Sequence, residues 1–215
     1  MRRGRLGPSP RAAAAALALA ATVLLATALH TPPAQASDPT SRAIFAGGCF
    51  RCVEAAFDDV PGVVRTTSGF VGGHVDNPTY EQVSAGGTGH AEAVEVEFDP
   101  KRTSYGRLLD VFWHNVDPLT AGRQFCDVGD QYRSAIFWLD EEQHRAAVAS
   151  REAIEKGGRL HGPIVTEILP AGRFWPAEEY HQDYHRKNPA KYRFYRWSCG
   201  RDDRLREVWG KAPAH

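Results

Sequence analysis

Residues 42–60 read RAIFAGGCFRCVEAAFDDV, and the rest of the fold can be worked out from this stretch. Its first five residues form an apolar run that predicts a short buried strand. From Phe50 onward apolar side chains recur at spacings of three and four, which predicts one face of a helix. Gly47 and Gly48 let the backbone turn sharply between the two elements. Cys49 is therefore expected in the first turn of the helix.

Cys49 has the sequence surroundings of a reactive thiol. The first turn of a helix leaves backbone N–H groups unpaired and carries the positive end of the helix dipole, and both stabilise an anion such as a thiolate. Arg51 is a neighbouring cation, so it is expected to lower the pKa of Cys49 from the roughly 8.5 of a free cysteine. A small buried cysteine that packs like alanine is the alternative, but the glycines before it and the helix after it favour a nucleophile.

Length and composition fit one domain. The 215 residues are 42% hydrophobic, which is enough to bury a single good core. The formal net charge is zero, so no basic excess points to a nucleic acid and no acidic excess points to a cationic partner. Any partner must therefore be inferred from the site itself.

The first 36 residues differ from everything that follows. Residues 1–11 are basic, residues 12–29 are an unbroken run of Ala, Leu, Val and Thr, and residues 34–36 read AQA, the small-residue pattern of a cleavage site. This predicts a secretory signal peptide at 1–36 and a mature catalytic domain at 37–215, exported to the periplasm or secreted. An uncleaved membrane anchor is the less favoured alternative, because the apolar run is at the short end for a spanning helix.

The exported part holds an even number of cysteines: Cys49, Cys52, Cys126 and Cys199. Two structural disulfide bridges would be the ordinary use of four cysteines outside the cytoplasm. A domain of about 180 residues, however, does not need the stapling that a small scaffold needs. A redox-active set of thiols is the preferred interpretation.

A second candidate catalytic group is Glu92. The sequence HAEAVEVEFDP from His90 alternates apolar and polar residues, which predicts a half-buried strand. Glu92 falls on the same side as Val94 and Phe98, so its carboxyl is expected to face the core. Burial of an unpaired carboxylate is costly and raises its pKa, so Glu92 is expected to carry a proton near neutral pH and to serve as a general acid.

The rest of the chain alternates predicted strands and helices, which indicates an α+β fold. Strands are expected at 62–73, 134–139 and 164–169, helices at 103–116, 140–156 and from Pro176 onward, and loops at 77–80, 120–131 and around Cys199. The helix from Pro176 would carry His181 and His185 on one face, a spacing that metal ligands can have. Surface packing of these histidines is the preferred interpretation.

Five motifs follow one another along the chain. They are GGCF at 47–50, PTYEQV at 78–83, GTGHAE at 87–92, DVGDQYRS at 127–134 and PAEEYHQDY at 176–184. In this order they resemble the peptide methionine sulfoxide reductases of the A type, which act on the S epimer of the sulfoxide. The resemblance covers essentially all of residues 43–209. It implies a ferredoxin-like two-layer α+β sandwich with a mixed central sheet, no bound cofactor and no metal.

The resemblance also implies a role for each matched residue. Cys49 corresponds to the nucleophile and Glu92 to the acid that protonates the sulfoxide oxygen. Binding of that oxygen, directly or through water, is implied for Tyr80, Tyr132 and Asp127.

Substrate binding is implied for residues beside the nucleophile. Phe50 corresponds to one wall of the pocket for the substrate methyl group, and His90 lies in the GTGHAE motif. The family usually has a tryptophan as the other wall, where this chain has Arg51. The affinity of the pocket is therefore expected to differ from that of the family, while the chemistry is expected to be the same.

The reaction explains these residue types. A thiolate can attack the sulfur only if an acid converts the poor leaving oxygen toward a hydroxyl, and the product is methionine and a cysteine sulfenic acid. A second thiol then forms a disulfide. Cys199 resembles the usual resolving cysteine of the family, while Cys52, one helical turn on, and Cys126, next to Asp127, also remain candidates.

The expected partners follow from this chemistry. A thioredoxin-like dithiol is expected to reduce the disulfide, and the substrates are expected to be oxidised proteins or free methionine sulfoxide. The chain is expected to act as a monomer in the repair of exported proteins, without nucleic acid and without a membrane association beyond its signal peptide.

Two other functions fit parts of the same sequence. The Cys49-x-x-Cys52 pair at a helix start is found in thioredoxin-type thiol–disulfide exchangers, but the elements before it are too few for that fold. Four cysteines could also hold zinc or an iron–sulfur cluster. This chain has only one closely spaced pair, so the metal module is disfavoured.

Overall fold

The computed structural model describes residues 40–210. The predicted signal peptide, residues 1–36, lies outside the described residues. Within 40–210, no helix combines the length and the apolar character needed to cross a bilayer.

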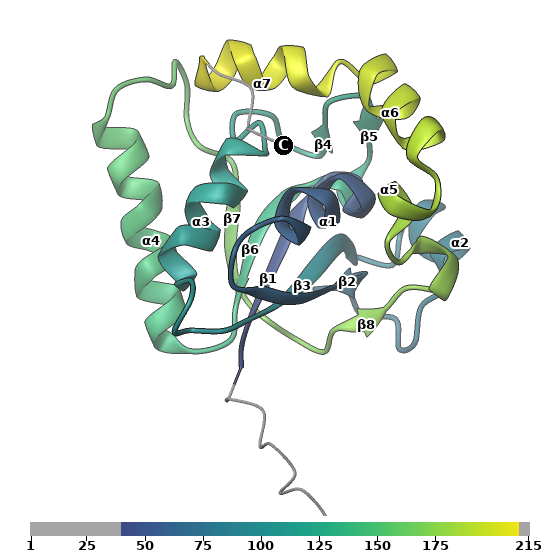
Figure 1. Cartoon of the computed structure of the whole chain (residues 1–215). Coiled ribbons are helices and arrows are strands. Elements are labelled where there is room, and N and C mark those ends of the chain that lie inside the picture. The colour runs from purple at the N-terminus through teal and green to yellow at the C-terminus, as the bar shows by residue number, and fades with distance from the viewer. Residues whose placement is uncertain (1–39, 211–215) are drawn as a thin grey trace, which may run out of the picture. The chain divides into compact units, whose positions relative to one another are not determined.

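A six-stranded sheet forms the centre of the fold (Figure 1), in the order β7-β6-β1-β3-β2-β8. Its strands are β1 (Ser41–Gly47), β2 (Val63–Val71), β3 (Ala91–Phe98), β6 (Ser134–Trp138), β7 (Glu167–Pro170) and β8 (Trp175–Pro176). The β6–β7 pair is parallel and the other pairs are antiparallel. The prediction of strands and helices around a mixed sheet is thus confirmed.

Strand β1 lies between β3 and β6 and is buried on both faces. Ala43 and Phe45 face the larger apolar cluster, while Ile44 and Ala46 face the smaller one on the opposite side. Phe45 pairs with Val94 of β3. A strand with neighbours on both edges and side chains packed on both faces must be apolar throughout, which explains the unbroken run in its sequence.

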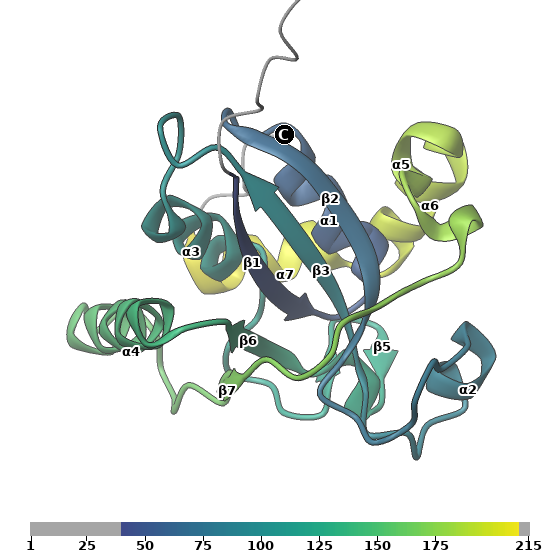
Figure 2. The same cartoon turned by 90° about the horizontal axis from the view of Figure 1, so that it is seen from below.

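Helices α1 (Phe50–Asp58), α3 (Tyr105–His114) and α7 (Arg201–Trp209) pack on one face of the sheet (Figure 2). On the opposite face the chain between β7 and β8 crosses the sheet, and its Phe174 packs on the smaller cluster. The remaining helices are α2 (Tyr80–Ser84), α4 (Glu141–Lys156), α5 (Tyr184–Lys187) and α6 (Pro189–Ser198).

The helices predicted at 103–116 and 140–156 are confirmed, and each begins at a capping residue. The side chain of Ser104 accepts a hydrogen bond from the Arg107 N–H at the start of α3, and Asp140 does the same for the Gln143 N–H at the start of α4. Between α1 and α3, the Phe45 ring stacks on Phe57 at 5.0 Å. This stack ties the C-terminal end of α1 to β1.

The helix predicted from Pro176 is wrong. Pro176 belongs to β8, and only a 3-10 turn, η2 (Glu179–His181), and the four-residue α5 follow. Gln182 breaks the helix, because its side chain bonds both the N–H and the carbonyl of Ser68 in β2 at 2.8 and 2.9 Å. Asp183 then adopts a φ of 52°.

Two predicted loops contain short elements of their own. Thr79 caps α2 within the predicted turn at 77–80, and β4 (Arg123–Gln124) pairs with β5 (Asp127–Val128) in the polar loop at 120–131. Cys199 ends α6 and Gly200, with a φ of 68°, starts α7. Each of these short elements brings a predicted site residue close to the start of α1.

Candidate active site

Cys49 is the N-cap of α1, where the sequence predicted it. A Cβ on Gly47 would lie 2.7 Å from Cγ1 of Val116, and Gly48 has a φ of 83°, so both glycines are required for the turn that delivers Cys49. The Cys49 side chain is 9% exposed. The thiol is therefore largely enclosed by the protein.

Glu92 lies in β3 and is 2% exposed, which confirms that its carboxyl faces the core. The N–H of Phe50, the residue after Cys49, donates to Oε2 of Glu92 at 3.0 Å. Burial raises the pKa of Glu92 to about 8, although the Phe50 N–H opposes the shift. At neutral pH the carboxyl next to Cys49 is thus protonated and can give a proton to a bound oxygen.

Two phenols and a second carboxyl lie around the same point. Tyr80 starts α2, Tyr132 ends the 3-10 turn η1 (Asp130–Tyr132), and Asp127 belongs to β5. Burial raises the pKa of Tyr132, and the charges of Glu92, Tyr80, Asp127 and Cys49 raise it further. Both phenols therefore stay protonated as hydrogen-bond donors, and the five predicted polar groups lie within electrostatic reach of one another.

Asp127 is held by a neighbour that the sequence did not indicate. The Tyr195 hydroxyl of α6 donates to Oδ2 of Asp127. Burial raises the pKa of Asp127, while this hydrogen bond and the charge of Arg201 lower it. The C-terminal helices therefore help to fix the polar side of the site.

Phe50 provides an aromatic wall. Its ring centroid lies 5.0 Å from His181, 5.8 Å from Phe70 and 6.2 Å from Tyr80. Tyr80 and His181 are themselves 4.2 Å apart. Such an apolar group next to a thiol and an acid suits a small apolar substituent on the sulfur that reacts.

The four cysteines form one disulfide and one free pair. Cys126 is bonded to Cys199, with 5.0 Å between their Cα atoms, so the interpretation as two structural bridges is wrong. Cys49 and Cys52 are free and buried. Cys126, Asp127 and Cys199 are close enough to share a metal ion, but the two sulfurs are bonded to each other and are not thiolate ligands in this state.

Comparisons with known proteins agree with this geometry. The model of the family described as peptide methionine sulfoxide reductase matches residues 41–213. The chain belongs to this family. The peptide methionine sulfoxide reductase MsrA of Bacillus licheniformis is 47% identical over 79% of this chain and 93% of its own length. The namesake from Methanothermobacter thermautotrophicus is 57% identical over 70% of this chain and 89% of its own length.

A solved structure supports the same assignment. Methionine sulfoxide reductase A of Corynebacterium diphtheriae superposes with a TM-score of 0.64 at 36% identity, covering 72% of this chain and 77% of its own. The reductase described here therefore reduces methionine sulfoxide by thiol chemistry. The alternative of a thioredoxin-type exchanger is set aside by the family match across residues 41–213.

His90 of the reductase holds the loop that follows β2 through hydrogen bonds to its backbone. It is 2% exposed, its Nδ1 accepts from the N–H of Gly73 at 3.1 Å, and its Nε2 donates to the carbonyl of Val75 at 2.8 Å. Both ring nitrogens are engaged with backbone after β2. His90, predicted as a substrate-binding residue, thus reaches the site only through that loop.

Arg51 of the reductase does not act on the nucleophile as predicted. Its Nε donates to Nδ1 of His181 at 3.2 Å, and its guanidinium lies 4.0 Å from the centroid of the Tyr184 ring. The pKa of Cys49 is raised by the hydrogen bond with Cys52, by burial and by the charge of Glu92. The expectation that Arg51 lowers this pKa is corrected, because the side chain extends toward α5.

The contacts of Arg51 with His181 and with the Tyr184 ring suggest an experiment. Arg51→Trp adds an apolar surface beside Phe50 and removes a cation from His181, whose pKa is lowered to about 4 by burial and then by Arg51. We expect the KM for methionine sulfoxide to fall by roughly threefold, since a buried methyl contributes about 0.8 kcal/mol. We also expect the pKa of His181 to rise, as measured by NMR titration. Arg51→Lys is the matched control: it keeps the cation and should leave KM unchanged.

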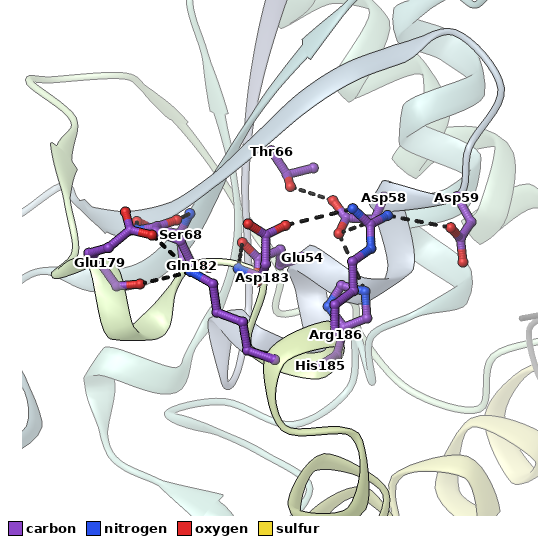
Figure 3. Close-up of polar contacts among 11 residues, drawn as sticks. Glu54, Asp58, Asp59, Thr66, Ser68, Glu179, Gln182, Asp183, His185 and Arg186 are labelled. Atoms are coloured by element: carbon purple, nitrogen blue, oxygen red, sulfur yellow. Dashed lines mark hydrogen bonds and ion pairs between the residues drawn. The ribbon is translucent and has the colours of Figure 1, made fainter.

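A buried acidic cluster fixes the segment that carries His181 and Tyr184 (Figure 3). Glu54 of α1, 1% exposed, accepts from the Asp183 N–H at 3.2 Å, and burial raises its pKa to about 7. Asp58, one turn later, accepts from the Thr66 hydroxyl and lies 3.4 Å from Nε2 of His185. Helix α1 therefore begins at Cys49 and, along its length, holds the segment that carries His181 and Tyr184.

The sequence patterns placed none of four residues that border the site: His181, Tyr184, Tyr195 and Arg201. Surface packing was expected for His181, and this is wrong, because His181 is 0% exposed. The first two lie in the PAEEYHQDY motif at 176–184, which was the available signal. Tyr195 and Arg201 flank Cys199, and no local pattern marked them. Their positions depend on contacts with β1, with β5 and with Asn115 after α3, all distant in sequence.

Proposed function

We propose that Cys49 attacks the sulfur of methionine-S-sulfoxide while Glu92 donates a proton to its oxygen. The observation that carries this proposal is the buried Glu92 carboxyl, whose pKa of about 8 keeps it protonated beside Cys49. A sulfoxide oxygen cannot leave as an oxide, so a proton donor near neutral pH is what the reaction requires.

Tyr80 and Tyr132 hold the oxygen in line with the attacking sulfur. Their phenols remain neutral donors, because burial raises both pKa values. As the Cys49–sulfur bond forms, negative charge develops on the oxygen, and donors already in place stabilise it without reorganisation. The oxygen ends on Cys49 as a sulfenic acid and methionine leaves.

The arrangement of the walls explains a preference for one epimer. With the methyl group against Phe50 and the oxygen toward Glu92, only one configuration at sulfur directs the remaining substituent out of the pocket. We assign this to the S epimer, following the A type. Assay of both epimers with a small dithiol tests it: the S epimer should be consumed, and equal consumption of the R epimer would contradict the assignment.

The Cys126–Cys199 disulfide is the bond on which an external dithiol acts. Cys126 is exposed, so a thioredoxin-like protein can approach it, whereas Cys49 is buried. No bound cofactor is needed, because the electrons come from thiols. Both free methionine sulfoxide and oxidised proteins are compatible with a site at the molecular surface.

Loss of Cys199 should separate chemistry from recycling. Cys199→Ser should still form one methionine per chain, but its turnover with a thioredoxin-like donor should fall by at least tenfold, because the disulfide that the donor reduces cannot form. The measurement compares methionine in a single turnover with the steady-state rate. Ser198→Ala, one residue earlier on the exposed side of α6, is the control. Unimpaired recycling in Cys199→Ser would show that the donor acts on another disulfide.

The proposal extends to the fold and the compartment. The succession β1-α1-β2-β3-α3-β6, with strand order β6-β1-β3-β2, supports a ferredoxin-like core. Residues 1–36 support export to the periplasm or beyond, cleavage before Ser37 and a role in repairing exported proteins. N-terminal sequencing of the exported protein tests the cleavage site, and sedimentation tests the proposed monomer.

A further inference from the structure

Strand β2 has an outer edge that its neighbour covers only in part. In the sheet β2 lies between β3 and β8, but β8 pairs with it at Gly69 and Phe70 alone. Among the strands formed by residues 40–210, no other strand covers β2 on that side, so its residues 63–67 form an open edge. An open edge presents backbone N–H and carbonyl groups to which another extended chain can bind.

The protein already binds one amide group to this edge. The side chain of Gln182 lies beside Ser68 as a peptide group of a further strand would: its Oε1 accepts from the Ser68 N–H at 2.8 Å, and its Nε2 donates to the Ser68 carbonyl at 2.9 Å (Figure 3). Both backbone groups of Ser68 therefore point away from β3. Because the direction alternates along a strand, those of Thr66 point the same way. In the described part of the chain, they have no partner there.

A groove of about 490 Å³ runs along this open edge. Residues 63–67 of β2 form one side of it, and the end of α1 and parts of segment 176–186 form the other. The charged residues of its lining have both signs: Asp58, Glu179, Asp183, Arg65 and Arg186. The groove therefore favours no strongly acidic or basic ligand, and its ordered hydrogen-bonding groups are those of the β2 backbone.

The groove adjoins the pocket for the sulfoxide. Gln182 lines the groove and directly follows His181, whose ring packs on Phe50. Along β2, the strand continues from Thr66 to Phe70, whose ring also packs on Phe50. This distance is about 13 Å, the length of roughly four extended residues. A polypeptide with its methionine sulfoxide in the pocket can thus reach Thr66 with a short flanking segment.

We propose that the open edge of β2 binds an extended, unfolded segment of an oxidised protein as an added β-strand. This inference deepens the proposed function and rests on it for the position of the sulfoxide. A polypeptide is the ligand that fits, because the edge offers backbone groups in a row next to the pocket of a peptide methionine sulfoxide reductase. The β-bulge between Val63 and Arg65 ends the regular edge, so the added strand is short and can dissociate.

Binding through the backbone has a consequence for the choice of substrate. Main-chain hydrogen bonds do not depend on the side chains of the bound segment, so methionines in varied sequences can use the same edge. A segment inside a folded helix or sheet has its own backbone groups already paired. The edge therefore favours oxidised methionines in unfolded segments over those in folded elements.

The first test compares substrates on the wild-type protein. A peptide that extends about five residues to each side of methionine-S-sulfoxide should have a kcat/KM about tenfold above that of N-acetyl-methionine-S-sulfoxide amide, because it adds hydrogen bonds to β2. N-methylation of the peptide backbone removes one N–H at a time. On one flank, methylation of alternate residues should remove the gain, and methylation of the residues between them should not.

Two results of this test would overturn the inference. One is a kcat/KM that does not rise with peptide length, and the other is a loss that is equal at every methylated position. Both would leave the proposed function intact, because reduction of the small amide measures it separately. Absence of reduction with every substrate would remove the proposed function and the inference with it.

The second test observes the Thr66 N–H directly, by hydrogen exchange in isotope-labelled Cys49→Ser, which should bind the sulfoxide without reducing it. Saturating peptide should slow exchange at Thr66 by about tenfold or more, and the small amide should not. Thr67 is the matched control, because its N–H points toward Glu95 of β3 and is protected in both cases. Unchanged exchange at Thr66 in the peptide complex would refute the added strand. Protection that appears without peptide and rises with protein concentration would also refute it, and would assign the edge to a second copy of this chain.

Discussion

Cys49→Ser should abolish methionine sulfoxide reduction, with turnover below about 1% of the wild type. A serine hydroxyl does not ionise near neutral pH, and the thiolate is the species that attacks sulfur and accepts the oxygen. The measurement is methionine formed from the S epimer in a single turnover. This readout excludes effects on recycling.

The same variant should remain folded, so the loss can be assigned to chemistry. Cys49 is the N-cap of α1 and its side chain makes no capping hydrogen bond. Serine is a preferred N-cap residue, and a new bond to the helix start contributes about 0.5–1 kcal/mol. We therefore expect an equal or slightly higher Tm. Methionine formation well above background by a folded Cys49→Ser protein would show that another thiol is the nucleophile.

Local periodicity was enough to predict the positions of Cys49 and Glu92. The strand, the two glycines and the helix spacing placed Cys49 at a helix start, and alternation in residues 90–100 placed Glu92 on the core face. Both patterns act over a few residues, and the buried sheet leaves no other register for them. This is why the order of elements around the site was also predicted correctly.

The second wall of the site could not be predicted in this way. Its segment follows β8, and Gln182 bonds to Ser68, 114 residues away, instead of continuing a helix. Arg51 bonds to His181 over a separation of 130 residues, which removes its guanidinium from Cys49. The raised pKa of Cys49 likewise depends on contacts, above all with Cys52. Spacing along the chain contains none of this information.

The pairing of the cysteines could not be predicted from the sequence, for a similar reason. Cys126 and Cys199 are 73 residues apart, and four cysteines allow several pairings with equal local support. Only the packing of α6 and α7 against β5 and the end of β1 brings this pair together. The structure thereby separates an inner thiol pair from an outer disulfide.

Glu92 imposes a cost on stability that should be measurable. Burial raises its pKa in the folded protein from 4.5 to about 8. A raised carboxyl pKa means that the folded state binds more protons than the unfolded state between these values, so stability is full below pH 4.5 and declines as the pH rises to 8. A glutamine at this position cannot titrate. The free energy of unfolding of Glu92→Gln should therefore vary less with pH than that of the wild type, by on the order of a few kcal/mol across this range.

Glu92→Gln should strongly lower the rate of reduction, although it makes the stability of the fold less sensitive to pH. The amide is nearly isosteric and its oxygen can still accept the Phe50 N–H, but it cannot donate the proton that the sulfoxide oxygen needs, so we expect a loss of roughly two to four decades in rate. In the wild type, ionisation of Glu92 should lower the rate above about pH 8, and this decline should vanish in the variant. Glu95→Gln is the matched control, because Glu95 lies in the same strand on the opposite face, paired with Arg42 at 3.1 Å. A Glu92→Gln enzyme as fast as Glu95→Gln would assign proton donation to another group, and Tyr80 and Tyr132 would be the residues to test.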